Sequence, residues 1–165
     1  MRKLDTRAMY LRNFVFGVED SIVSTVGLLS GVAAADVPGS TVFLTGLVLI
    51  SVEAFSMGAG SFLAESEAED IMEQKEVSSR KPFLGSLIMF ISYFVSGLVP
   101  LLPYQFLEGD QALKTSIILS ILALVCLGFI GAKVAKINMG KNILRMVIIG
   151  GLAIVIGILV GSITT

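Results

Sequence analysis

The chain has 165 residues, of which 55% are hydrophobic, and its formal net charge is −1. A soluble domain of this length cannot bury so much apolar surface, because its core must still be covered by polar residues. The charged residues are concentrated between long apolar stretches, which is typical of a polytopic membrane protein, and we expect no nucleic-acid partner. The single cysteine, Cys126, excludes a disulfide within the chain.

The apolar stretches predict an all-α membrane protein with five transmembrane helices in one domain, residues 1–165. A hydrocarbon core of about 30 Å requires roughly 20 helical residues. The stretches that reach this length are 13–35, 41–64, 83–105, 113–135 and 143–163. We expect the second helix to continue beyond the membrane to about residue 80, because proline is absent until Pro82.

Turn residues separate these helices. Pro38 and Gly39 predict a tight turn after the first span, and residues 136–141 form a short polar connection between the last two. Near the end of the third span, Gly97, Pro100 and Pro103 predict a kinked or unwound helix.

The distribution of lysine and arginine predicts the orientation in the membrane. The connections on one side contain Arg2, Lys3, Arg7, Arg12, Lys75, Arg80, Lys81, Lys133, Lys136, Lys141 and Arg145. The opposite side contains only Lys114. By the positive-inside rule, the N-terminus is cytosolic and the C-terminus is outside the cell or in a lumen.

An acidic segment follows the second span. It contains Glu65, Glu67, Glu69, Asp70, Glu73 and Glu76, together with Met72. Glu65, Glu69, Glu73 and Glu76 recur at steps of four and three and so share one helix face. This face is either a solvated helix end or a surface that collects cations, with Glu65, Glu69, Met72 and Glu73 as candidate metal ligands.

Two carboxylates lie within the spans themselves. Counting along the helices places Asp20 about 10 Å and Glu53 about 12 Å from the cytosolic surface, on adjacent antiparallel helices. Met57 lies one turn after Glu53 on the same face. A charged residue in a membrane is costly and typically marks an ion path, and two carboxylates with a thioether suit a divalent transition metal. Histidine, the commonest ligand for such metals, is absent. Alternatively, Asp20 and Glu53 only hydrogen-bond across helices, one of them protonated.

Three motifs resemble those of the vacuolar iron transporter family. The first is GVEDSIVST, residues 17–25, with the glycines of GL and GV that follow it. The others are SMGAG with FLA, residues 56–64, and the proline motif at residues 97–104. The resemblance implies a five-helix subunit that dimerises, with an ion path between subunits lined by the first helix. It also implies export of ferrous iron, and often manganese, from the cytosol in exchange for protons, with Asp20, Glu53 and Met57 along the path.

The chain departs from the family pattern at several points. Asn13 stands where the family commonly has an acidic residue, and Ser21 stands where a glycine usually follows the aspartate. Eukaryotic members also insert a large cytosolic metal-binding domain between the second and third helices. Only a short segment is available for it here.

Our leading hypothesis is a proton-coupled exporter of divalent metal ions, working as a homodimer in the lipid bilayer. Its cargo is ferrous iron or manganese, and no cofactor is expected. The short chain favours a multi-pass protein of a prokaryotic plasma membrane, or otherwise of a vacuolar-type membrane. The alternative is a non-transporting metal sensor or scaffold. An enzyme is disfavoured, because histidine is absent and no nucleophile–base pair stands out.

Overall fold

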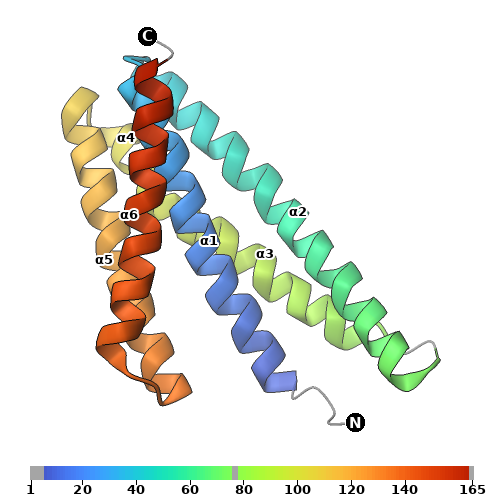
Figure 1. Ribbon diagram of the computed structural model, residues 1–165. Coiled ribbons are helices and arrows are strands. Elements are labelled where there is room, and N and C mark those ends of the chain that lie inside the picture. Colours follow the sequence, from blue (N-terminus) through green and yellow to red (C-terminus); the bar gives the residue numbers. More distant parts are fainter. Residues whose placement is uncertain (1–5, 76–77, 164–165) are drawn as a thin grey trace.

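The computed structural model describes residues 6–75 and 78–163, and within these ranges its regular structure is entirely helical (Figure 1). The helices are α1 (Thr6–Ala34), α2 (Gly39–Glu73), α3 (Arg80–Leu101), α4 (Pro103–Phe106), α5 (Gly109–Ala135) and α6 (Met139–Ile163). Five of them, all except α4, are long and apolar enough to cross a membrane. The predicted all-α fold with five spans is confirmed.

The long helices extend further than the apolar stretches alone predict. α1 begins at Thr6, and α6 begins at Met139. Hydropathy identifies only the part of a helix that crosses hydrocarbon, whereas backbone hydrogen bonding continues into the polar flanks. α1, with 29 residues, has a length of about 44 Å at 1.5 Å per residue, which exceeds the hydrocarbon thickness.

The second helix continues past the membrane, but it ends before residue 80. Gln74 has a φ of 53° and a ψ of 33°, the left-handed conformation that commonly ends a helix. α2 therefore ends at Glu73. Glu76 lies outside the described residues, so its predicted place on the acidic face has no structural counterpart here.

The proline motif divides the predicted third span. α3 continues through Pro100 to Leu101, and Pro103 opens the short helix α4 in the first-turn position that proline tolerates. The carbonyl of Pro100 accepts a hydrogen bond of 2.7 Å from Ser116 of α5. A side chain from another helix thus satisfies a carbonyl where α3 ends.

α1 is the central helix and packs against α3, α6, α5 and α2 (Figure 1). The pair α2 and α3 diverges from the pair α5 and α6 toward the end where α1 begins. Much of the remaining surface carries large apolar side chains, such as Phe55, Leu122 and Ile156, which suits contact with lipid.

Glycines allow α1 and α6 to approach closely. Gly27 and Gly31 of α1 face Gly157 and Gly161 of α6, and a methyl group built on Gly31 would lie 2.7 Å from the carbonyl oxygen of Gly157. Such spacing of small residues is a common way for membrane helices to pack backbone against backbone. This contact places α6 beside α1, and the same glycines form part of the lining of the groove described below.

Candidate functional site

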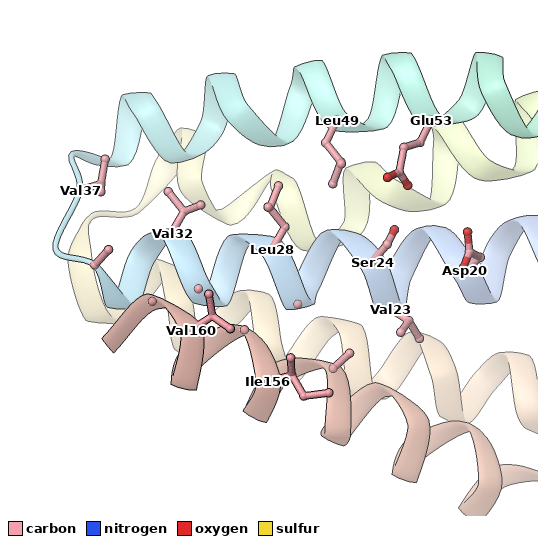
Figure 2. A pocket seen from close by; sticks show the side chains of 16 residues that line it. Asp20, Val23, Ser24, Leu28, Val32, Val37, Leu49, Glu53, Ile156 and Val160 are labelled. Atoms are coloured by element: carbon pink, nitrogen blue, oxygen red, sulfur yellow. The ribbon is translucent and has the colours of Figure 1, made fainter. Parts of the chain in front are cut away.

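A groove of about 720 Å³ runs along α1 between α2 and α6. Figure 2 shows its lining, in which apolar side chains such as Leu28, Val32 and Ile156 line most of the groove and a few polar ones lie toward one end. The polar side chains in this lining are Asp20 and Ser24 of α1 and Glu53 of α2. The two carboxylates predicted at matched depth therefore line the same groove.

Helical spacing explains how these residues come to share the groove. Asp20, Ser24 and Leu28 follow one another at steps of four along α1, so they lie on one face. Glu53 lies one turn from Leu49 on α2, and both line the groove. Figure 2 shows the Glu53 carboxylate extending from α2 toward α1, where Asp20 and Ser24 lie. Asp20 and Glu53 are each only partly buried.

Tyr93 is a member of this site that the sequence analysis missed. Its side chain comes from α3 and is fully buried. The phenol donates a hydrogen bond to Oε2 of Glu53, and its oxygen lies 2.7 Å from Oγ of Ser24. The sequence did contain a sign of this role, because Tyr93 lies inside an apolar span. A buried phenol requires a hydrogen-bond partner, which a nearby polar residue must supply.

Met57 lies in a different cavity. This second cavity, of about 640 Å³, lies between α1 and α2, nearer to the start of α1, and its lining includes Asn13, Met57 and Met89. Met89 comes from α3 and is 4% exposed. A role of Met57 as a metal ligand stays a prediction.

The acidic face of α2 is divided between the interior and the surface. Glu65 is 6% exposed, Glu69 and Met72 are partly buried, and Glu73 is exposed. Oε1 of Glu65 accepts hydrogen bonds from Asn13 at 2.6 Å and from Arg12 at 3.0 Å. To bind a metal through this oxygen, Glu65 would have to give up these contacts.

Within the described residues, neither group of carboxylates forms a complete metal site. Within residues 6–75 and 78–163, no three side chains among Asp, Glu, His and Cys gather closely enough to hold a metal ion. The groove supplies two carboxylates and the hydroxyl of Ser24. Oxygen ligands of this kind suit a partly hydrated divalent cation, with water as a further ligand.

Comparison with known proteins gives matches along almost the whole chain. The model of the VIT family matches residues 11–81 and 71–162. Vacuolar iron transporter homolog 4 of Arabidopsis thaliana is 30% identical over 161 residues, covering 91% of this chain and 81% of the relative. Vacuolar iron transporter 1 of Tulipa gesneriana is 25% identical over 203 residues, covering 87% of this chain and 82% of the relative.

The comparisons also indicate where these relatives differ in length. The alignment with the tulip protein spans 203 residues, which exceeds the 165 of this chain. That relative therefore contains residues within the aligned region that this chain lacks. The two parts of the family match meet at residues 71–81, the connection between α2 and α3. This is the connection that the sequence analysis identified as too short for a further domain.

Proposed function

Because the chain belongs to the VIT family, as its motifs predicted, we propose that it exports divalent transition-metal ions from the cytosol in exchange for protons. Ferrous iron is the proposed cargo, with manganese as a second one. The observation that carries the proposal is the groove in which Asp20 and Glu53 meet, in a chain with five membrane-spanning helices.

The groove has the chemistry that an ion path requires. A divalent cation crosses hydrocarbon only where ligands replace part of its hydration shell, and carboxylate oxygens do this well. Asp20 and Glu53 supply two negative charges, which balance the charge of one divalent ion. Ser24 adds a neutral oxygen beside them.

The same carboxylates provide a reason for proton coupling. A carboxylate must be deprotonated to bind a metal, so metal and proton compete for the same oxygens. If Asp20 and Glu53 take up protons from the opposite side of the membrane, the metal is released there. The protons are then carried back to the cytosol, so a proton gradient drives export.

A homodimer completes the path in this proposal. In a single subunit the carboxylates are only partly buried, and a charge that faces lipid is costly. A second copy lying against the groove face of α1 would remove both carboxylates from lipid. It would also bring a second Asp20 and a second Glu53 to the path, because a two-fold interface uses the same face of each subunit.

The orientation follows from the basic residues. The start of α1, the start of α3, the end of α5 and the start of α6 lie at one end of the bundle (Figure 1). These helix ends carry Arg12, Arg80, Lys133, Lys141 and Arg145. We assign this end to the cytosol, which puts the end of α2, with Glu69, Met72 and Glu73, where cytosolic metal would enter.

The proposal is tested by ferrous-ion flux into proteoliposomes of known orientation, with and without a pH gradient. We expect gradient-dependent flux for the wild type. Asp20→Asn should reduce flux at low iron concentration by roughly ten- to a hundredfold, since an interaction with a charged group contributes about 1.5–3 kcal/mol. Asp36→Asn is the matched control, because Asp36 lies in the turn between α1 and α2.

One outcome would count against the role of Asp20, and another would count against export itself. Flux in Asp20→Asn equal to that of the wild type would remove Asp20 from the path. Wild-type protein that binds iron or manganese but carries neither across the membrane would instead support the sensor hypothesis.

A further inference from the structure

We propose that Tyr93 is a positioning residue for the ion path, holding the Glu53 carboxylate in the orientation that receives the metal. This inference rests on the proposed export function, and it assigns to α3 a role that the acidic residues of α1 and α2 do not reveal. The contacts of the Tyr93 hydroxyl carry it.

The hydrogen bonds around Tyr93 have a defined direction. A phenol has one proton to donate, and Tyr93 donates it to Oε2 of Glu53. Ser24 then donates in the 2.7 Å contact with Tyr93, in preference to its longer contact of 3.4 Å with the carbonyl of Ser21. Ser24 therefore donates to Tyr93, and Tyr93 donates to Glu53, so that the chain of hydroxyls ends on the carboxylate as acceptor.

Tyr93 is itself held firmly. Its ring is fully buried, and its backbone carbonyl accepts a hydrogen bond of 2.6 Å from Ser21 of α1. The hydroxyl of Tyr93 on α3 therefore contacts Ser24 of α1 and Glu53 of α2, while its backbone carbonyl is held by Ser21 of α1. A hydroxyl fixed in this way limits the rotation of the longer and more flexible glutamate side chain.

This arrangement leaves the carboxylate available to an ion. An ionised carboxylate has about four lone-pair sites, and the bond from Tyr93 occupies one of them. The remaining sites of Glu53 can accept a cation together with Asp20, which lines the same groove. Tyr93 acts through Glu53, and we assign it no direct contact with the metal.

Loss of the hydroxyl should weaken binding of the ion more than it slows transport. In Tyr93→Phe the ring still fills its site, but the Glu53 carboxylate is free to rotate away from the groove. We expect the iron concentration at half-maximal flux to rise about tenfold, the effect of losing one hydrogen bond to a charged group. The maximal flux should stay within about a factor of two, the pattern of an interaction made equally in the bound state and during transport.

The experiment measures ferrous-ion flux against iron concentration in proteoliposomes for the wild type, Tyr93→Phe and Tyr104→Phe. Tyr104 is the matched control, because it is also a buried tyrosine (6% exposed) but lies in α4 and lines another cavity. We expect both kinetic constants of Tyr104→Phe to equal those of the wild type. Thermal unfolding of each purified protein reports whether it is folded.

The remaining results would contradict the role of Tyr93 or the proposed function. A half-maximal concentration for Tyr93→Phe equal to that of the wild type would overturn the proposal, and so would a variant that no longer folds, since the role of the phenol would then be structural. A similar rise in Tyr104→Phe would also overturn it. Wild-type protein that carries no iron would overturn the proposed function together with this inference, whereas a normal wild type beside an unaffected Tyr93→Phe overturns this inference alone.

Discussion

The carboxylates of α1 and α2 differ in what their oxygens contact. Asp20 and Glu53 line an open groove. Glu65, three turns further along α2 from Glu53, is buried among polar side chains of α1 and α2. A carboxylate that faces a groove is available to a ligand, whereas one that already accepts several hydrogen bonds primarily stabilises the fold.

The contacts of Glu65 contribute unequally. Arg12 is 63% exposed, so its ion pair with Glu65 is well screened by solvent and contributes little. Asn13 is 1% exposed and donates to Oε1 of Glu65 at 2.6 Å and to Ser61 at 3.0 Å. The buried amide is therefore the more important partner. This also gives Asn13, the position at which the family commonly has an acid, a role in joining α1 to α2.

We predict that Glu65→Ala destabilises the protein. The substitution leaves the amide of Asn13 without its shortest hydrogen bond, and a buried polar group left in this way costs about 1–3 kcal/mol in the free energy of unfolding. Thermal unfolding in detergent measures the change. Glu67→Ala is the control, because Glu67 is exposed on the same helix. If the two variants unfold at the same temperature, the buried contacts of Glu65 do not stabilise the fold.

At the scale of helices, the packing of α6 against α1 depends on backbone contact. Gly157 is the tightest point, since a methyl group there would overlap the carbonyl oxygen of Gly27. Backbone atoms cannot rotate out of the way as the end of a side chain can. Any larger residue at Gly157 must therefore move α6 away from α1, which would widen the groove that both helices line.

Two glycine substitutions in α6 should differ in their effect on the free energy of unfolding. Gly157→Ala should reduce the free energy of unfolding by about 1–3 kcal/mol, the usual cost of overpacking. Gly151→Ala should leave stability unchanged or raise it by about 0.5–1 kcal/mol, because nothing lies within 4 Å of the added methyl group and alanine favours a helix. Thermal unfolding of both variants checks the pair. Equal stability of the two would contradict the close α1–α6 contact.

For the whole molecule, the proposed dimer accounts for a groove that one subunit leaves open. The groove is bordered by α2 and α6, and its floor is α1. Its lining is largely apolar except for Asp20, Ser24 and Glu53. An apolar surface with a few acidic groups is poorly matched to lipid, but it matches a second copy of itself when a cation lies between the carboxylates.

Cross-linking tests this arrangement. In a Cys126→Ser background, we expect Leu28→Cys on the groove to form a disulfide-linked dimer in membranes under mild oxidation. Leu122→Cys on α5, which is 55% exposed and outside the groove lining, is the control and should remain monomeric. The readout is the fraction of chain at twice the monomer mass on a non-reducing gel. A dimer formed only through Leu122→Cys would place the interface on another face.

The all-α fold, the five membrane-spanning helices, the family, and the presence of acids within the spans were all predictable from the sequence. These depend on local properties: the length of apolar stretches, the turn residues between them and the spacing of motif residues. Helix ends were less predictable, because Gln74 ends α2 by a backbone conformation that hydropathy does not report. The third span was predicted to reach residue 105 with a kinked or unwound end, whereas α3 ends at Leu101 and Pro103–Phe106 form a separate short helix.

The rotation of each helix about its own axis was not predictable, and the site depends on it. In a membrane, lipid is as apolar as the protein core, so hydrophobicity does not indicate which face of a helix meets its neighbours. The sequence alone predicted that Asp20 and Glu53 lie at similar depths within the spans. Only the tertiary structure decided that they line one groove with Tyr93 behind them, that Met57 faces another cavity, and that Glu65 is buried against Asn13.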